Sequence, residues 1–151
     1  MRTLLFPWFC LCLLLGTPAA ALATDNNLAM KATLIWGCDE EKPNDPKIKP
    51  VSPEMAKRLR GIFKWKHYFE VKTDTATIAD KATKDFVLSH KCTVKVKNDA
   101  GKAFNAQLLG EGKLLKAIDQ PVKPGEDMVL AGDDKNATAW FVILTPQSAP
   151  H

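Results

Sequence analysis

Residues 86–108, FVLSHKCTVKVKNDAGKAFNAQL, contain the pattern that decides the fold. Over 86–97, apolar and polar side chains alternate, which is typical of a β-strand with one face buried and the other in water. Residues 98–101 have the composition of a turn, and the alternation resumes at Phe104. We therefore predict one long strand, a turn and a returning strand, with Cys92 on the inward face.

The same pattern recurs at short intervals along the rest of the chain. Further strands are predicted over residues 32–36, 68–72, 73–78, 114–118, 128–131 and 137–144. Segments rich in Gly, Pro, Asn and Asp separate them, without the regular alternation of strands and helices that builds a parallel sheet. The sequence therefore predicts a mainly β fold: an antiparallel, immunoglobulin-like β-sandwich of about seven or eight strands with one short amphipathic helix.

The single predicted helix begins after Ser52, a residue that can cap its first turn, with Pro53 at the first helical position. Apolar side chains recur along it at helical spacing: Met55, Leu59, Ile62 and Phe63. Most of the side chains between them are cationic. We expect the helix to pack its apolar stripe on the sheet and to expose a basic face. Residues 39–50 contain three prolines among charged residues and are predicted to form a surface loop.

Residues 1–23 have the pattern of a secretory signal peptide. Arg2 supplies a positive start, an apolar run covers 4–16, and Ala21-Leu22-Ala23 fits the small-residue rule for cleavage. The apolar run is shorter than the ~20 residues that span a bilayer. The sequence therefore predicts a secreted or periplasmic protein with no membrane span once the signal is removed.

Removal of the signal leaves residues 24–151, about 128 residues, which is the size of one domain. Its first and last residues, 24–30 and 146–151, are expected to be flexible. The whole chain has a formal net charge of +4. A positive charge of this size favours solubility and does not indicate nucleic acid, so no nucleic-acid partner is expected.

Two of the four cysteines, Cys38 and Cys92, lie outside the signal peptide. An even number of cysteines in an exported domain favours a disulfide, which would here join the two sheets. The alternative is a zinc or copper site that uses Cys38, His90 and Cys92, since thiolate and imidazole are ligands of both metals. The spacing lacks a CxxC or HxxxH element, so we predict the disulfide and neither metal nor cofactor.

Basic residues concentrate in residues 47–66, where Glu54 is the only acid. Aromatic side chains alternate with lysines at the end of this segment. A segment of this composition can bind an anionic surface, an anionic polymer or another protein. The predicted binding surface consists of Lys57, Arg58, Arg60, Lys64, Trp65 and Lys66. The competing interpretation is that the lysines are merely solvated and the aromatic rings fill the core.

The sequence contains no recognisable catalytic arrangement. Its serines lack the GxSxG context of a nucleophile, and Gly110-Glu111-Gly112 does not open a helix as a phosphate loop would. The turn at residues 132–136 lacks the spacing of a calcium-binding loop. We therefore predict a non-enzymatic domain that binds a protein or an anionic polymer. A small enzyme or enzyme inhibitor with a site built from loops is the alternative.

Two segments of the chain are similar in sequence to segments of other proteins: FKWKHYFEV at 63–71 and VLAGDDKNATAWFV at 129–142. In these segments the chain resembles a group of short, uncharacterised secreted bacterial proteins. The resemblance implies an exported domain of the bacterial envelope or the extracellular space, and it implies no catalytic residues.

Overall fold

The computed structural model describes residues 25–40, 45–132 and 138–148, which form nine strands and one helix. The predicted signal peptide lies outside these residues. The elements are β1 (Leu28–Cys38), β2 (Lys49–Pro50), α1 (Pro53–Arg60), β3 (His67–Ile78), β4 (Thr83–Ser89), β5 (Cys92–Asp99), β6 (Ala103–Gly110), β7 (Lys113–Pro121), β8 (Met128–Ala131) and β9 (Ala139–Gln147).

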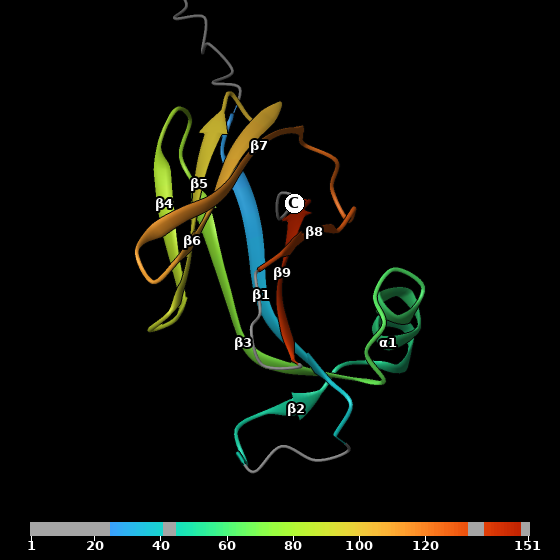
Figure 1. The fold of residues 1–151 in the computed structure, drawn as a ribbon. Coiled ribbons are helices and arrows are strands. Elements are labelled where there is room, and N and C mark those ends of the chain that lie inside the picture. The colour runs from blue at the N-terminus through green and yellow to red at the C-terminus, as the bar shows by residue number, and fades with distance from the viewer. Residues whose placement is uncertain (1–24, 41–44, 133–137, 149–151) are drawn as a thin grey trace, which may run out of the picture.

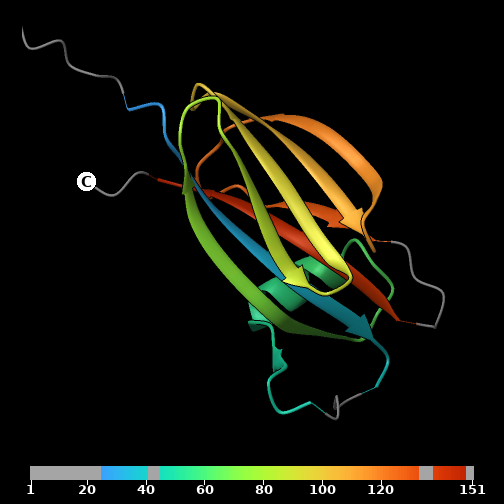
Figure 2. The same cartoon turned by 90° about the vertical axis from the view of Figure 1, so that its left-hand side faces the viewer.

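The predicted antiparallel β-sandwich is confirmed. Sheet A has the strand order β2-β3-β1-β9-β8, and sheet B is the meander β4-β5-β6-β7. Figure 1 shows the helix α1 on the side of sheet A that faces away from sheet B, and Figure 2 shows sheet B in front of sheet A. The described part of the molecule therefore has three layers: sheet B, sheet A and α1.

Sheet A is buried on both faces over part of its area. On one face, the main core between the sheets includes Met30 and Leu34 of β1. On the other face, a second apolar cluster joins Ile35 of β1 to Leu59 of α1. This explains why β9, AWFVILTPQ, has a continuous apolar run instead of an alternating pattern.

The long strand predicted over 86–97 is two strands, so this prediction is wrong. The strands β4 and β5 pair through a turn at His90 and Lys91. A two-residue turn does not interrupt a period of two. The sequence of a tight hairpin therefore shows the same alternation of apolar and polar residues as one long strand. The inward residues are those expected: Phe86, Leu88, Cys92, Val94 and Val96 are all buried. His90, which the alternation would place on the inward face, lies in the turn and is exposed.

Three other boundaries differ from the prediction. The strands expected over 68–72 and 73–78 are one strand, β3, whose register against β1 shifts at a bulge beside Leu34 and Ile35. Within the segment expected to be a flexible lead-in, residues 28–30 already belong to β1, which begins at Leu28. At the other end β9 continues to Gln147, and residues 149–151 lie outside the described part of the chain.

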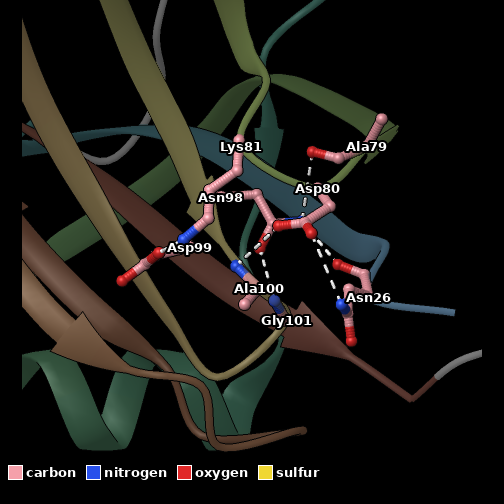
Figure 3. Close-up of polar contacts among 8 residues, drawn as sticks. All are labelled: Asn26, Ala79, Asp80, Lys81, Asn98, Asp99, Ala100 and Gly101. Carbon is pink, nitrogen blue, oxygen red and sulfur yellow. Dashed lines mark hydrogen bonds and ion pairs between the residues drawn. The ribbon is translucent and has the colours of Figure 1, made fainter. Parts of the chain in front are cut away.

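A buried amide holds the start of β1 in place, which local sequence patterns do not reveal. The side chain of Asn98 is fully buried, and its Nδ2 donates to the carbonyl oxygens of Asn26 (2.7 Å), Ile78 (3.0 Å) and Ala79 (3.2 Å). Its Oδ1 accepts from the backbone N–H of Gly101 at 2.9 Å (Figure 3). One side chain therefore joins the lead-in to β1, the end of β3 and the β5–β6 turn.

Candidate binding surface on helix α1

The helix α1 begins where the sequence predicts. Ser52 is the N-cap, and its side chain accepts a hydrogen bond from Met55 N at 3.2 Å. The helix ends at Arg60, with Gly61 as the C-cap. Because helical spacing ends there, Ile62 does not continue the apolar stripe as predicted but is 66% exposed.

The remaining stripe packs on sheet A. Leu59 is buried in the second apolar cluster, and Met55 and Phe63 are half-buried against it. The Phe63 ring lies 4.2 Å, centroid to centroid, from Phe141 of β9. Tyr68 donates from its hydroxyl to the Phe63 carbonyl at 3.3 Å, and burial raises the pKa of that hydroxyl. These contacts hold α1 and the loop after it on the sheet.

Trp65, predicted to belong to the binding surface, is a core residue, and only 9% of it is exposed. It packs on β1 at Gly37, where an added Cβ would lie 2.9 Å from Trp65 Cδ1. The alternation of aromatic and basic residues therefore places the ring inward and the lysines outward. Lys64 stays close to the ring, with its Nζ 4.8 Å from the ring centroid.

Arg58 has a partner that the sequence does not reveal. Its Nη1 lies 2.6 Å from Asp127 Oδ2, and the Asp127 side chain is only 10% exposed. The other carboxylate oxygen accepts from Thr145 Oγ1 at 2.5 Å. Arg58 therefore connects α1 to the segment before β8, and only part of its guanidinium is available to a ligand.

The other four cations, on α1 and the loop after it, are exposed. Arg60 donates from Nε to the Lys66 carbonyl at 3.2 Å, which fixes the guanidinium beside the loop. Within the described ranges, Lys57, Lys64 and Lys66 form no ion pair with a carboxylate. We call the exposed set the basic face: Lys57, Arg58, Arg60, Lys64 and Lys66.

Cys38 and Cys92 are both buried and both free, so the structure does not contain the predicted disulfide. Cys92 begins β5 in sheet B and belongs to the main core. Cys38 ends β1 in sheet A, where it pairs with His67 and its Sγ donates to the Glu40 carbonyl at 3.4 Å. Burial raises the pKa of Cys92 to about 11, and it also raises the pKa of Cys38.

The alternative metal site at Cys38, His90 and Cys92 is not assembled in the described part of the chain. Among the described residues, no three His, Cys, Asp or Glu side chains come together as metal ligands. A cavity of about 110 Å³ lies between the ends of β7 and β9; it is lined by Phe104, Gln120, Pro121, Lys123, Glu126, Asp127, Met128 and Pro146. The charged side chains in this lining are paired, Lys123 with Glu126 and Asp127 with Arg58.

Within the described ranges, no helix has the length and apolar character needed to cross a membrane. Comparisons of the chain with protein-family models, with curated proteins and with solved structures found no match.

Proposed function

We propose that this protein is an exported, non-enzymatic β-sandwich that binds an anionic polymer or an acidic protein through its basic face. The observation that supports this proposal is the placement of five exposed cations on α1 and the loop after it. Between residues 51 and 66 Glu54 is the only acid. Two apolar side chains of the segment, Leu59 and Trp65, are buried.

The two arginines suit this role because their guanidinium groups are already oriented. Arg58 is held by Asp127, and Arg60 is held through its Nε by a backbone carbonyl. An ordered side chain loses less conformational entropy when a ligand binds. Planar guanidinium groups also match the paired oxygens of carboxylate, sulfate and phosphate groups. Lys57, Lys64 and Lys66 would add attraction that depends on ionic strength.

The proposed place of action is the bacterial periplasm or the extracellular space. The signal-peptide pattern over residues 1–23 supports export. Anionic polymers and acidic protein surfaces are both compatible with a site that recognises charge more than shape.

Retention on heparin–agarose tests the proposal. The variant K57E/K64E/K66E reverses three cations that have no carboxylate partner among the described residues, and it leaves the Arg58–Asp127 pair in place. At about 0.01 M ionic strength, where the Debye length is about 30 Å, we expect the wild type to be retained and the variant to flow through. The matched control K84E/K97E/K102E reverses three exposed lysines of sheet B and the turn beside it.

Retention of the control together with loss of the triple variant supports the basic face. Equal retention of the triple variant contradicts it, and so does equal loss in both variants, because net charge alone would then explain the binding. Circular dichroism of each variant checks that the sandwich is intact.

A further inference from the structure

Strand β7 differs from the other strands of sheet B in its exposure. It is the edge strand of that sheet, and among the described residues it pairs only with β6. Eight of its nine residues are exposed, and Ile118 is half-buried. In the neighbouring strand β6, by contrast, buried and half-buried residues alternate. One edge and most of both faces of β7 are therefore open.

Exposed apolar side chains lie at one end of sheet B, and two of them, Leu114 and Leu115, belong to β7. The described residues include four large exposed apolar side chains, and three of them, Val87, Leu114 and Leu115, lie at one end of sheet B. The strand register aligns Val87 with Thr93, Leu109 and Leu114 in one row across the sheet. Leu114 is 59% exposed and Leu115 45%. An edge strand that exposes leucines is one that other chains can pair with.

A bulge in β7 gives Leu114 and Leu115 different positions relative to β6. The register between β6 and β7 shifts beside Leu109, so that Leu114 pairs with Leu109 while Leu115 has no partner in the ladder. Leu115 covers Gly110, where an added Cβ would lie 2.7 Å from Leu115 Cδ1. The β4–β5 and β6–β7 turns lie at this end of the sheet in both views, and Glu111 N donates to the Lys91 carbonyl at 2.8 Å (Figures 1 and 2). The turns therefore hold the end of β7 in position.

The charges of β7 indicate what kind of chain fits there. Lys113 and Lys116 flank the two leucines. Asp119 is the only acid of the strand, and it accepts a hydrogen bond from Asn105 Nδ2 at 2.9 Å. Pairing with β7 of a second copy would bring the lysines of both copies to one seam, which is unfavourable. A strand with carboxylates beside the lysines and apolar side chains beside the leucines complements the edge.

We propose that the free edge of β7 binds an extended peptide strand in which acidic and apolar residues alternate. The peptide would extend sheet B by main-chain hydrogen bonds along β7, a recognised mode of peptide binding. Its carboxylates would pair with Lys113 and Lys116, and its apolar side chains would cover Leu114 and Leu115. This site is separate from the basic face and does not depend on it.

The experiment is a titration of the ¹⁵N-labelled mature protein with the peptide Ac-EVEVEVEV-NH₂, followed by amide NMR shifts and hydrogen exchange. We expect saturable shifts in β6 and β7, and slower exchange of β7 amides. The variant K113E/K116E should weaken binding by about tenfold or more and should favour Ac-KVKVKVKV-NH₂ instead. The control K84E/K97E, on β4 and β5, should bind within about twofold of the wild type, as should K57E/K64E/K66E on α1.

Three results would overturn the proposal. The first is the absence of saturable shifts in β7, or shifts confined to α1. The second is concentration-dependent dimerisation through β7 in sedimentation equilibrium, which would make a second copy the occupant. The third is binding to phosphatidylglycerol vesicles that Leu114→Asn abolishes while the peptide has no effect, which would make the occupant a lipid surface. Thermal melts confirm that each variant is folded.

Discussion

Arg58 on helix α1 and Asp127, just before strand β8, are 69 positions apart in the chain, and their side chains meet at 2.6 Å. The carboxylate is 10% exposed and also accepts a hydrogen bond from Thr145 of β9. This contact attaches the outer layer of the molecule to both the edge and the interior of sheet A. Arg58 therefore stabilises the docking of α1 as well as contributing to the basic face.

Reversing the charge of Arg58 should destabilise the protein more than reversing the charge of its neighbour Lys57. Arg58→Glu places a second carboxylate against the nearly buried Asp127, and we expect a loss of about 2 kcal/mol in the free energy of unfolding. Lys57→Glu should change it by less than about 0.5 kcal/mol. Urea denaturation measures both, and equal effects would show that the Asp127 contact does not hold the helix.

Substitution of Asn98 should lower the free energy of unfolding more than substitution of most other polar residues. Asn98→Asp directs a carboxylate at three carbonyl oxygens in a fully buried site, and we expect a loss of about 3 kcal/mol or more. Asn105→Asp, on the outer face of β6, should cost less than about 1 kcal/mol. Hydrogen exchange should show that the start of β1 opens first in Asn98→Asp. A uniform loss of protection would argue against its role in anchoring the lead-in.

A methyl group at Gly37 should displace Trp65. Its Cβ would lie 2.9 Å from the indole and 3.0 Å from Phe141 Cε2, so Gly37→Ala should cost about 1–3 kcal/mol. Near-ultraviolet circular dichroism should show a changed tryptophan environment. Lys64→Ala, which removes only the cation above the ring, should cost less than about 1 kcal/mol. A Gly37→Ala protein as stable as the wild type would mean that the ring does not pack there.

The two thiols should be free and unreactive in the folded protein. Intact mass after alkylation with iodoacetamide at pH 8 should show no added groups under native conditions and two after denaturation, because both thiols are buried and burial raises their pKa. Reducing agent should leave the melting temperature unchanged. A mass two protons lower than expected, restored by reduction, would instead establish the disulfide.

Cys92 should make stability depend on pH in the alkaline range. Its pKa is about 11 in the folded state and 9.0 as the ordinary value. The folded protein therefore keeps a proton that the unfolded chain loses, and the free energy of unfolding should fall as pH rises from 9 to 11. The loss is at most about 3 kcal/mol for two pKa units. Cys92→Val should remove this component from a series of urea titrations; an unchanged slope would exclude Cys92 as its source.

Strands β5 and β6 show which structural features local sequence patterns can predict and which they cannot. Alternating side chains identified the inward face of this hairpin, and Phe104 and Val94 are buried as expected. The same patterns missed the turn at His90 and Lys91, because a two-residue turn does not interrupt a period of two. They also suggested a disulfide between Cys38 and Cys92, although cysteine count and spacing contain no information about which sheet each residue joins.

Only part of the candidate surface could be predicted from the sequence, namely the part that depends on local geometry. Helical spacing identified Lys57 and Arg60 as exposed because their positions on one helix depend on local geometry. It left open whether Trp65 is exposed or fills the core, since that depends on the space left by Gly37 on a strand that precedes the helix. The open edge of β7 was not foreseen either: the strand itself was predicted, but which strand lies at the edge of a sheet depends on the order in which strands pair.

The sequence by itself determined the β-rich class, the start of the helix, its basic outer side and the inward face of most strands, because these follow from side-chain periods and capping residues within a few positions. Only the tertiary structure decided which strands share a sheet, that sheet A is covered on both faces, that Arg58 meets Asp127, and that β7 remains open. These features depend on contacts between residues far apart in the chain, which form only where burial of apolar area outweighs the entropy of closing long loops.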